Sequence, residues 1–229
     1  MAKDKNKETH DTGAEALENA LTKTEQYIEN NQKSLTIIVL AVIVIVGTFL
    51  GYTRLYIAPM EKEAQSQIFA AEQYFERDSF NLALHGDGNY LGFLDIIDSY
   101  GPSKVGNLAH YYAGISFRQL GEFDKAVDHL KRFSTKDKMI RSVAFGALAD
   151  CYVELDNLRE GAKYYLRAAN ANENDFTSPI YLLKAGVVFE ELGSYTEALK
   201  QYEIIKDKFP RSAEAREIEK YITRVSLKK

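Results

Sequence analysis

"NLAHYYAGISFRQLGEFDKAVDHL", residues 107–130, contains a short motif that recurs twice further along the chain. The motif is LGEF at residues 120–123, LDNL at 155–158 and LGSY at 192–195, so successive copies lie 35 and 37 residues apart. A fixed period of this length indicates a repeated unit of supersecondary structure. The sequence therefore predicts a repeat protein.

Small and bulky residues occupy fixed offsets around each copy of the motif. They are Gly114, Phe117, Ala126 and Leu130 in the first unit; Leu148, Ala149, Tyr152, Gly161 and Tyr165 in the second; and Gly186, Phe189, Ala198, Tyr202 and Pro210 in the third. This pattern resembles the tetratricopeptide repeat, a pair of antiparallel helices of 34 residues. His110 and Leu182 replace its first aromatic residue, and its closing proline is present only at Pro210.

The resemblance predicts an all-α solenoid with three tetratricopeptide repeats at residues 107–211. Small residues let two helices approach closely, and aromatic residues fill the space beside them. Since a stack leaves its last apolar face open, a capping helix is expected at residues 212–229. Its apolar residues are Ala215, Ile218, Tyr221, Ile222 and Val225.

Residues 57–106 are expected to form a degenerate first repeat. Its repeat-like residues are Ala71, Tyr74, Asp78, Phe80 and Ala83. Its second helix is interrupted by an inserted loop containing Gly86, Gly88 and Gly92, which is followed by the apolar stretch 91–97 and a further expected helix. The role of this insertion does not follow from the repeat pattern.

Residues 34–53 are an uncharged stretch of twenty residues, of which twelve are Leu, Ile, Val or Phe. About twenty apolar residues in a helix cross a bilayer core. The stretch is longer than the apolar part of a secretory signal, follows 33 residues, and lacks an Ala-x-Ala cleavage site. We therefore predict a single transmembrane helix at residues 34–56, with Tyr52 and Tyr56 at a membrane interface.

Residues 1–33 are expected to form a cytoplasmic tail with a short amphipathic helix, either lying at the membrane or docking to a cytoplasmic partner. Asp11 or Thr12 would cap this helix, and its apolar face carries Ala14, Leu17, Leu21 and Ile28. Basic residues are balanced on the two sides of the span. The five Lys residues of the tail favour an N-terminus inside the cell and a C-terminal domain outside it.

Several classes of function are disfavoured by composition. The formal net charge is −4 with both signs interspersed, which argues against nucleic-acid binding. The one cysteine, Cys151, cannot form an internal disulfide. A lipid anchor of the usual exported type is not expected, because it needs a cysteine near the N-terminus. No nucleophile motif, phosphate loop or paired-acid pattern suggests an enzyme or a cofactor. No metal site is expected, because Asp87, Asp95 and Asp98 lack calcium-loop spacing, and His85, His110 and His129 are scattered.

Repeat solenoids bind partners through the concave face, which the first helix of each pair lines. In this chain the corresponding positions are Leu108, Tyr111, Ile115 and Arg118; Val143, Gly146, Asp150 and Val153; and Ile180, Leu183, Val187 and Glu190. This predicts a mostly apolar partner groove with acidic points. It lacks the Lys and Asn residues with which chaperone-binding tetratricopeptide clamps hold a carboxylate. These side chains either bind an extended or helical segment of another protein or pack between the helices.

Gly47 and Gly51 form a Gly-x-x-x-Gly pair in the predicted span. Two glycines on one face allow another membrane helix to approach closely. Such pairs also arise by chance, because glycine is frequent in membrane helices. A helix contact with a partner, or a homodimer, is the functional hypothesis.

The order of tail, span and repeats resembles the YfgM-like ancillary subunits of the bacterial SecYEG translocon. The resemblance includes ENALTKTEQYIENNQKSL before the span, EAQSQIFAAEQYF after it, and the repeat at residues 107–130. It implies a single-pass inner-membrane protein with a periplasmic domain. Its implied partners are the translocon and a membrane-anchored periplasmic chaperone of the prolyl-isomerase type, to which it helps exported chains pass. A scaffold for envelope assembly or cell division, and a cytosol-facing receptor, are the alternatives.

Overall fold

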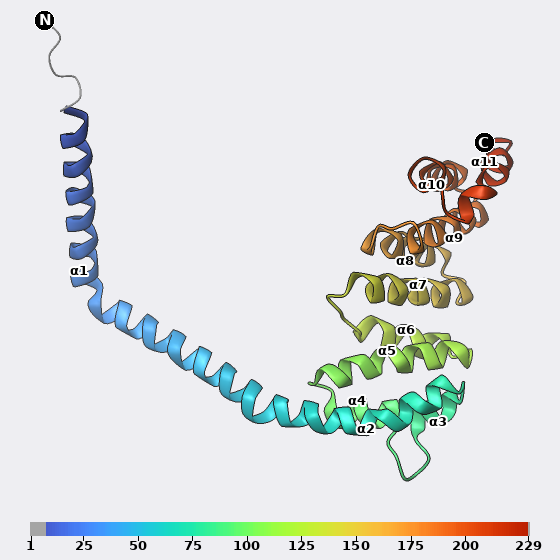
Figure 1. The fold of residues 1–229 in the computed structure, drawn as a ribbon, viewed down its shortest axis with the longest axis horizontal. Helices are drawn as coiled ribbons and strands as arrows, with labels where there is room; N and C mark the ends of the chain where they lie inside the picture. The colour runs from blue at the N-terminus through green and yellow to red at the C-terminus, as the bar shows by residue number, and fades with distance from the viewer. Residues whose placement is uncertain (1–7, 229) are drawn as a thin grey trace, which may run out of the picture. The chain divides into compact units, whose positions relative to one another are not determined.

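The computed structural model describes the backbone of residues 8–228, and the side chains of Lys23 and of residues 25–228 (Figure 1). The described residues are helical and contain no strand, in agreement with the predicted all-α class. The chain divides into two compact units, residues 1–56 and 57–229.

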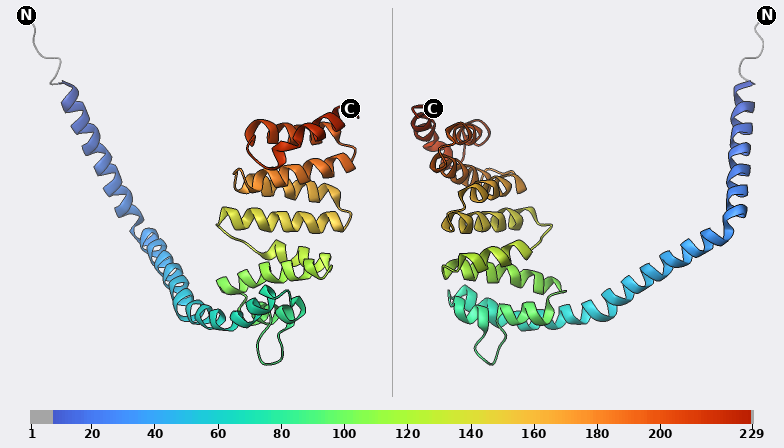
Figure 2. Two further views of the ribbon diagram at one scale, coloured as in Figure 1. Left: turned by 45° about the vertical axis from the view of Figure 1, so that its right-hand side comes forward. Right: turned by 180° about the vertical axis from the view of Figure 1, so that it is seen from behind.

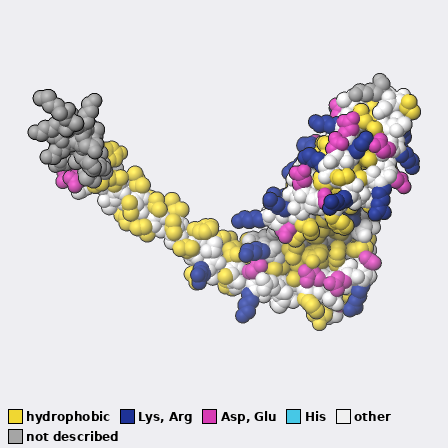
Figure 3. Space-filling model, turned by 45° about the horizontal axis from the view of Figure 1, so that its top comes forward, with side chains coloured by type: hydrophobic (Ala, Val, Ile, Leu, Met, Phe, Trp, Pro, Cys, Tyr) yellow, Lys and Arg dark blue, Asp and Glu magenta, His cyan; other side chains and the backbone are white. Residues whose placement is uncertain are grey.

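The first unit is built on helix α1, Glu8–Tyr52, followed by one π-helical turn, Thr53–Ile57, that continues into the second unit. The helix begins before the predicted caps Asp11 and Thr12 and continues unbroken past residue 33. The predicted face residues Ala14, Leu17 and Leu21 lie outside the described side chains. Ile37, Val44 and Phe49 expose 64–67% of their surface, and hydrophobic side chains cover the part of this helix that Figure 3 colours by type. The helix is long and apolar enough to cross a membrane.

The second unit consists of helix pairs stacked in layers (Figure 2). The first pair is α2 (Ala58–Glu76) with α3 (Phe80–His85), and α4 (Phe93–Tyr100) follows it. The next pairs are α5 (Lys104–Gln119) with α6 (Phe123–Arg132), α7 (Lys138–Glu154) with α8 (Leu158–Ala171), and α9 (Thr177–Glu191) with α10 (Tyr195–Lys208). A 3₁₀ turn, Glu214–Arg216, and helix α11, Ile218–Ser226, complete the chain.

All four pairs use the same turn, including the degenerate first repeat. The turn residues with positive φ are Asp78 (55°), Gly121 (77°), Asp156 (57°) and Gly193 (69°). Each donates its backbone N–H to the carbonyl three residues earlier, and the next residue donates to the carbonyl five residues earlier, at 2.8–3.1 Å. Gly, Asn and Asp tolerate this left-handed conformation best. The pair at residues 58–85 therefore shares its turn geometry with the three later pairs.

The insertion is a closed loop with a narrow neck. A Cβ atom on Gly86 would lie 2.1 Å from the Tyr90 carbonyl oxygen, and one on Gly92 would lie 2.2 Å from that of Leu84. The Asp87 carboxylate accepts hydrogen bonds from the Tyr90 N–H (2.8 Å), the Asn89 N–H (2.9 Å) and the Tyr74 hydroxyl (2.8 Å), and these bonds lower its pKa. Among the described residues no three acidic, His or Cys side chains gather as metal ligands.

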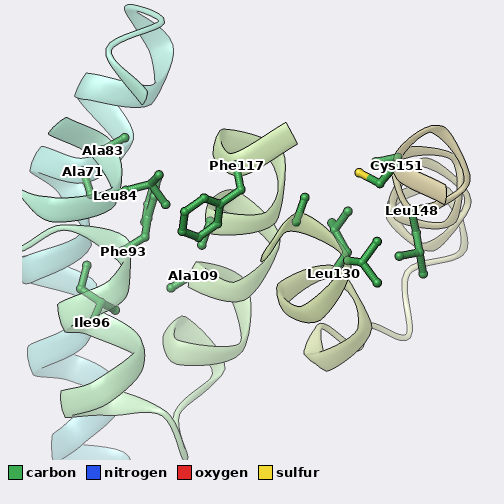
Figure 4. Close-up of a cluster of buried hydrophobic side chains, with 14 of the residues drawn as sticks. Ala71, Ala83, Leu84, Phe93, Ile96, Ala109, Phe117, Leu130, Leu148 and Cys151 are labelled. Atoms are coloured by element: carbon green, nitrogen blue, oxygen red, sulfur yellow. The ribbon is translucent and has the colours of Figure 1, made fainter. Parts of the chain in front are cut away.

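Helix α4 returns the chain to the core after this loop. Phe93 and Ile96 are fully buried, and Figure 4 shows them facing Leu84 and Ala109. The Phe93 ring stacks on Tyr112 at 5.0 Å and meets Phe75 edge-on at 6.2 Å. α4 therefore supplies the large apolar side chains that the six-residue helix α3 is too short to provide.

At the other end of the stack, α11 covers the last pair with fully buried Val225 and Ile218. The predicted capping helix at residues 212–229 is shorter in the structure, because a 3₁₀ turn precedes it. Ser212 accepts a hydrogen bond from the Ala215 N–H at this turn (3.1 Å). The turn brings Ala215 against the same core cluster.

Ala126→Trp is expected to destabilise the repeat unit by about 1–3 kcal/mol, because Ala126 has no exposed surface and a larger ring would overpack the core. Thermal unfolding of a fragment beginning at Ile57 measures this effect. Lys125→Trp, one residue earlier at an exposed position, is the matched control. An unchanged melting curve for Ala126→Trp would contradict the repeat register.

Candidate partner-binding groove

The first helices of the last three pairs bring a charged network together around Asp150. Its Oδ2 accepts a hydrogen bond from Arg118 Nη1 on α5 (2.7 Å). Its Oδ1 accepts from the Tyr165 hydroxyl on α8 (2.6 Å) and from Lys184 Nζ on α9 (2.7 Å). The Asp150 carboxylate, on α7, therefore links α7 to α5, α8 and α9, and so joins three successive helix pairs.

The network is partly desolvated and carries two cations for one anion. The Arg118 and Asp150 side chains are 29% and 24% exposed. Burial, followed by the hydrogen bond to Asp150, raises the pKa of Tyr165 and keeps its hydroxyl a donor. Arg118 Nε is buried without a hydrogen-bond partner among the described residues. The network lines an open cleft of about 500 Å³ together with Gln119, Phe123, Val153 and Glu154.

The apolar part of the predicted groove is only partly open. Tyr111 is half-buried against Tyr112 and Phe133 (ring centroids 5.8 and 5.2 Å apart). The ring of Tyr181 occupies the space at Gly146, where a Cβ atom would lie 2.2 Å from it. Val187 is 43% exposed. The remaining apolar groove residues are half-buried: Leu108, Ile115, Val143, Val153, Ile180 and Leu183.

Glu190, at the end of the groove, forms an ion pair with Arg224 of the C-terminal helix α11. Its carboxylate accepts from Arg224 Nε (3.0 Å), from Arg224 Nη2 (2.5 Å) and from the Tyr202 hydroxyl (2.7 Å). Burial opposes ionisation, but these hydrogen bonds hold the pKa of Glu190 below its ordinary value. Glu190 therefore anchors α11, and the part of the groove available to a partner centres on Asp150.

Sequence reasoning missed Lys184, and it assigned Tyr165 to packing alone. Lys184 follows the predicted groove residue Leu183 by one position and reaches Asp150 only because α7 and α9 lie close enough. The sequence analysis also missed a histidine pair, because His110 and His129 are 19 residues apart in the chain. Their Nδ1 atoms are 3.0 Å apart, which requires one to donate and the other to accept.

Acidification is expected to destabilise the protein through this histidine pair. Burial, followed by the nearby His110 and Arg132, lowers the pKa of His129 to about 4 from 6.5, and Asp128 opposes this only weakly. Burial and Arg132 also lower the pKa of His110. Between pH 6.5 and 4 the unfolded chain thus binds more protons than the folded one, so stability falls as the pH falls, by about 1–2 kcal/mol for these partly exposed rings.

Urea unfolding of the fragment from Ile57 at pH 7 and pH 5 tests this dependence. His129→Gln should reduce the difference between the two pH values, whereas His85→Gln, at an exposed site, should leave it unchanged. Equal pH dependence in the wild type and the His129→Gln variant would contradict a role for the pair.

Comparison with known proteins identifies the repeats. The tetratricopeptide repeat family matches residues 108–137 and 181–212, which cover most of α5 with all of α6, and most of α9 with all of α10. The chain carries tetratricopeptide repeats. Repeats of this type mediate protein–protein interaction, and nothing in these comparisons points to an enzyme.

Solved structures similar to this chain include two of MamA. The crystal structure of MamA protein has a TM-score of 0.52 and 17% sequence identity, over 72% of this chain and 91% of that one. A further crystal structure of MamA has a TM-score of 0.40 and 21% identity, over 59% of this chain and 88% of that one. The first similarity shows a shared fold. No curated protein matches the chain in sequence.

Proposed function

We propose that this protein is a membrane-anchored, non-enzymatic adaptor whose groove binds a segment of a partner protein. The observation that carries the proposal is the Asp150 network, which places Arg118 and Lys184 in an open cleft lined also by Phe123 and Val153. Val187, which is exposed, lies on the same helix as Lys184. Such a cleft offers hydrogen bonds to a partner's backbone and acidic groups, and apolar contact beside them.

Photocrosslinking tests this use of the groove. A crosslinking amino acid at Val187 should capture a partner, whereas the same amino acid at exposed Lys125 on α6 should not. A partner captured equally at both positions, or at neither, would contradict binding through the groove.

The finer proposal is that the partners are the SecYEG translocon and a membrane-anchored periplasmic chaperone, with the span in a bacterial inner membrane and the repeats in the periplasm. Its support is the resemblance of the tail, span and first repeat to the YfgM-like subunits. In this proposal the adaptor helps exported chains pass from the translocon to the chaperone. An envelope-assembly or cell-division scaffold shares the same orientation, and a cytosol-facing receptor has the opposite one.

Protease treatment of spheroplasts tests the orientation. With the inner membrane intact, the repeats should be digested if they are periplasmic. Digestion only after the membrane is ruptured would exclude the periplasmic orientation and favour the cytosol-facing receptor. If the repeats are periplasmic, capture of SecYEG subunits at Val187 would distinguish a translocon accessory from an envelope scaffold.

Replacing both Gly47 and Gly51 by Leu is expected to reduce co-purification of partner membrane proteins in mild detergent. An added Cβ atom at either glycine has open space within 4 Å, so the substitution removes a close-approach surface without disturbing α1. Ala41→Leu with Val44→Leu is a control in the same helix. Undiminished co-purification would exclude the glycine face as a docking site, and loss of self-association alone would indicate a homodimer.

A further inference from the structure

A basic cleft of about 590 Å³ lies on α7, α8 and α9 and shares no residue with the Asp150 cleft. Four of its lining residues are cationic and none is acidic. The full set is Arg141, Phe145, Arg159, Lys163, Leu166, Arg167, Asn170, Ala171 and Phe189. In a chain of net charge −4, this local excess of positive charge calls for an explanation.

Two of the four cations are held in place by neighbouring groups. The Arg167 guanidinium carbon lies 4.2 Å from the centre of the Phe145 ring and 4.8 Å from that of Tyr164. Arg141 donates from Nε (3.1 Å) and Nη2 (2.6 Å) to the Thr135 carbonyl. Stacking leaves the N–H groups at the edge of Arg167 free to donate, and Arg141 keeps further donors. Arg141 and Arg167 therefore lose little side-chain entropy when a ligand binds, because they are already held in place.

The other two cations are exposed and available. Arg159 forms no ion pair among the described residues, and Lys163 pairs only with Glu160 on its own helix, at 3.0 Å. Exposed pairs of this kind are worth at most about 1 kcal/mol, so a ligand carboxylate can replace Glu160 at little cost. Between these cations lie the half-buried side chains of Phe145, Leu166 and Phe189.

We propose that this basic cleft binds a short acidic segment of a protein partner that also carries apolar side chains. Carboxylates would accept hydrogen bonds from Arg159, Lys163 and the free edge of Arg167. Apolar side chains of the same segment would pack on Phe145, Leu166 and Phe189. The cleft thus gives the adaptor a second binding site, separate from the groove and independent of the function proposed for it.

The charge of the molecule favours a short acidic segment over an extended polyanion. Electrostatic interactions between exposed charges are screened beyond about 8 Å at physiological salt, so a short segment interacts mainly with the four local cations. A nucleic acid or an anionic bilayer extends well beyond the cleft and meets the acidic surface of a chain with net charge −4. The apolar side chains in the cleft also suit a peptide better than a phosphate backbone.

Fluorescence anisotropy of the full chain in non-ionic detergent tests the proposal. The probe is a fluorescein-labelled peptide of alternating Glu and Leu, and the matched probe is alternating Lys and Leu. The wild type should bind only the acidic probe. Arg159→Glu with Lys163→Glu should weaken binding at least about tenfold, because attraction becomes repulsion at two contacts.

Lys62→Glu with Arg77→Glu, at exposed sites on α2 and immediately after it, is the matched control, because it changes the net charge by the same amount. It should bind the acidic probe as the wild type does. Absence of binding, or equal weakening by the two double variants, would overturn the proposal. Stronger binding of single-stranded DNA or of phosphatidylglycerol vesicles than of the peptide would also overturn it and indicate a different class of ligand. Groove crosslinking at Val187 should be unchanged in the Arg159→Glu, Lys163→Glu variant, which separates this site from the proposed groove.

Discussion

Phe93→Ala is expected to lower the free energy of unfolding of the repeat unit by about 3–5 kcal/mol, the usual cost of removing a buried aromatic ring from a core. Phe93 has no exposed surface and contacts the rings of Tyr112 and Phe75. For a unit of this size, the change corresponds to a fall in melting temperature of roughly 6–20 °C. Thermal and urea unfolding of the fragment from Ile57 measure it.

Tyr90→Ala is the matched control, because it removes an aromatic ring from the same insertion. Tyr90 is 58% exposed at the loop, so its loss should change stability by no more than about 0.5 kcal/mol. If Phe93→Ala changed the stability as little as Tyr90→Ala, the chain after the loop would contribute little to the core. A large effect confined to Phe93 would show that the chain after the loop completes the core of the first repeat.

The repeat fold was predictable because its main determinant is local. Small residues at fixed offsets, such as Ala126 and Ala198, have no exposed surface in the structure, as expected for positions where helices pack closely. Ala71 and Ala83, two small residues of the predicted degenerate first repeat, are also fully buried. The role of α4 was not predictable, because an apolar stretch does not by itself reveal which neighbouring helices it will contact.

The candidate site was only partly predictable, since it depends on side chains that reach between helices. Arg118 and Asp150 were expected in the groove from their repeat positions, but their ion pair requires the actual spacing of α5 and α7. The ring of Tyr181 fills the space at Gly146, and Arg224 forms an ion pair with Glu190. Two predicted groove positions are therefore covered by other residues of the chain. These three contacts join residues 32 to 35 positions apart, and the sequence alone does not give the distances between their side chains.

Asp150→Ala is expected to destabilise the repeat unit by about 2–4 kcal/mol. The substitution removes the acceptor shared by Arg118, Lys184 and Tyr165, and leaves a partly buried guanidinium without its counter-charge. Asp150→Asn keeps one acceptor oxygen and should cost less. Lys163→Ala, which removes half of an exposed pair within α8, is the control and should change stability by less than about 1 kcal/mol.

A double variant separates the structural role of this network from its role in binding. Arg118→Leu with Asp150→Leu replaces this ion pair by apolar side chains and leaves only the exposed Lys184 of the three charges, so it should recover most of the stability lost in Asp150→Ala. If the network serves only to hold α5, α7 and α9 together, the double variant should also recover crosslinking from Val187. If Arg118 contacts the partner, as we propose, the double variant should be stable and still lose capture of the partner. Recovery of both properties would exclude the Asp150 network from partner recognition.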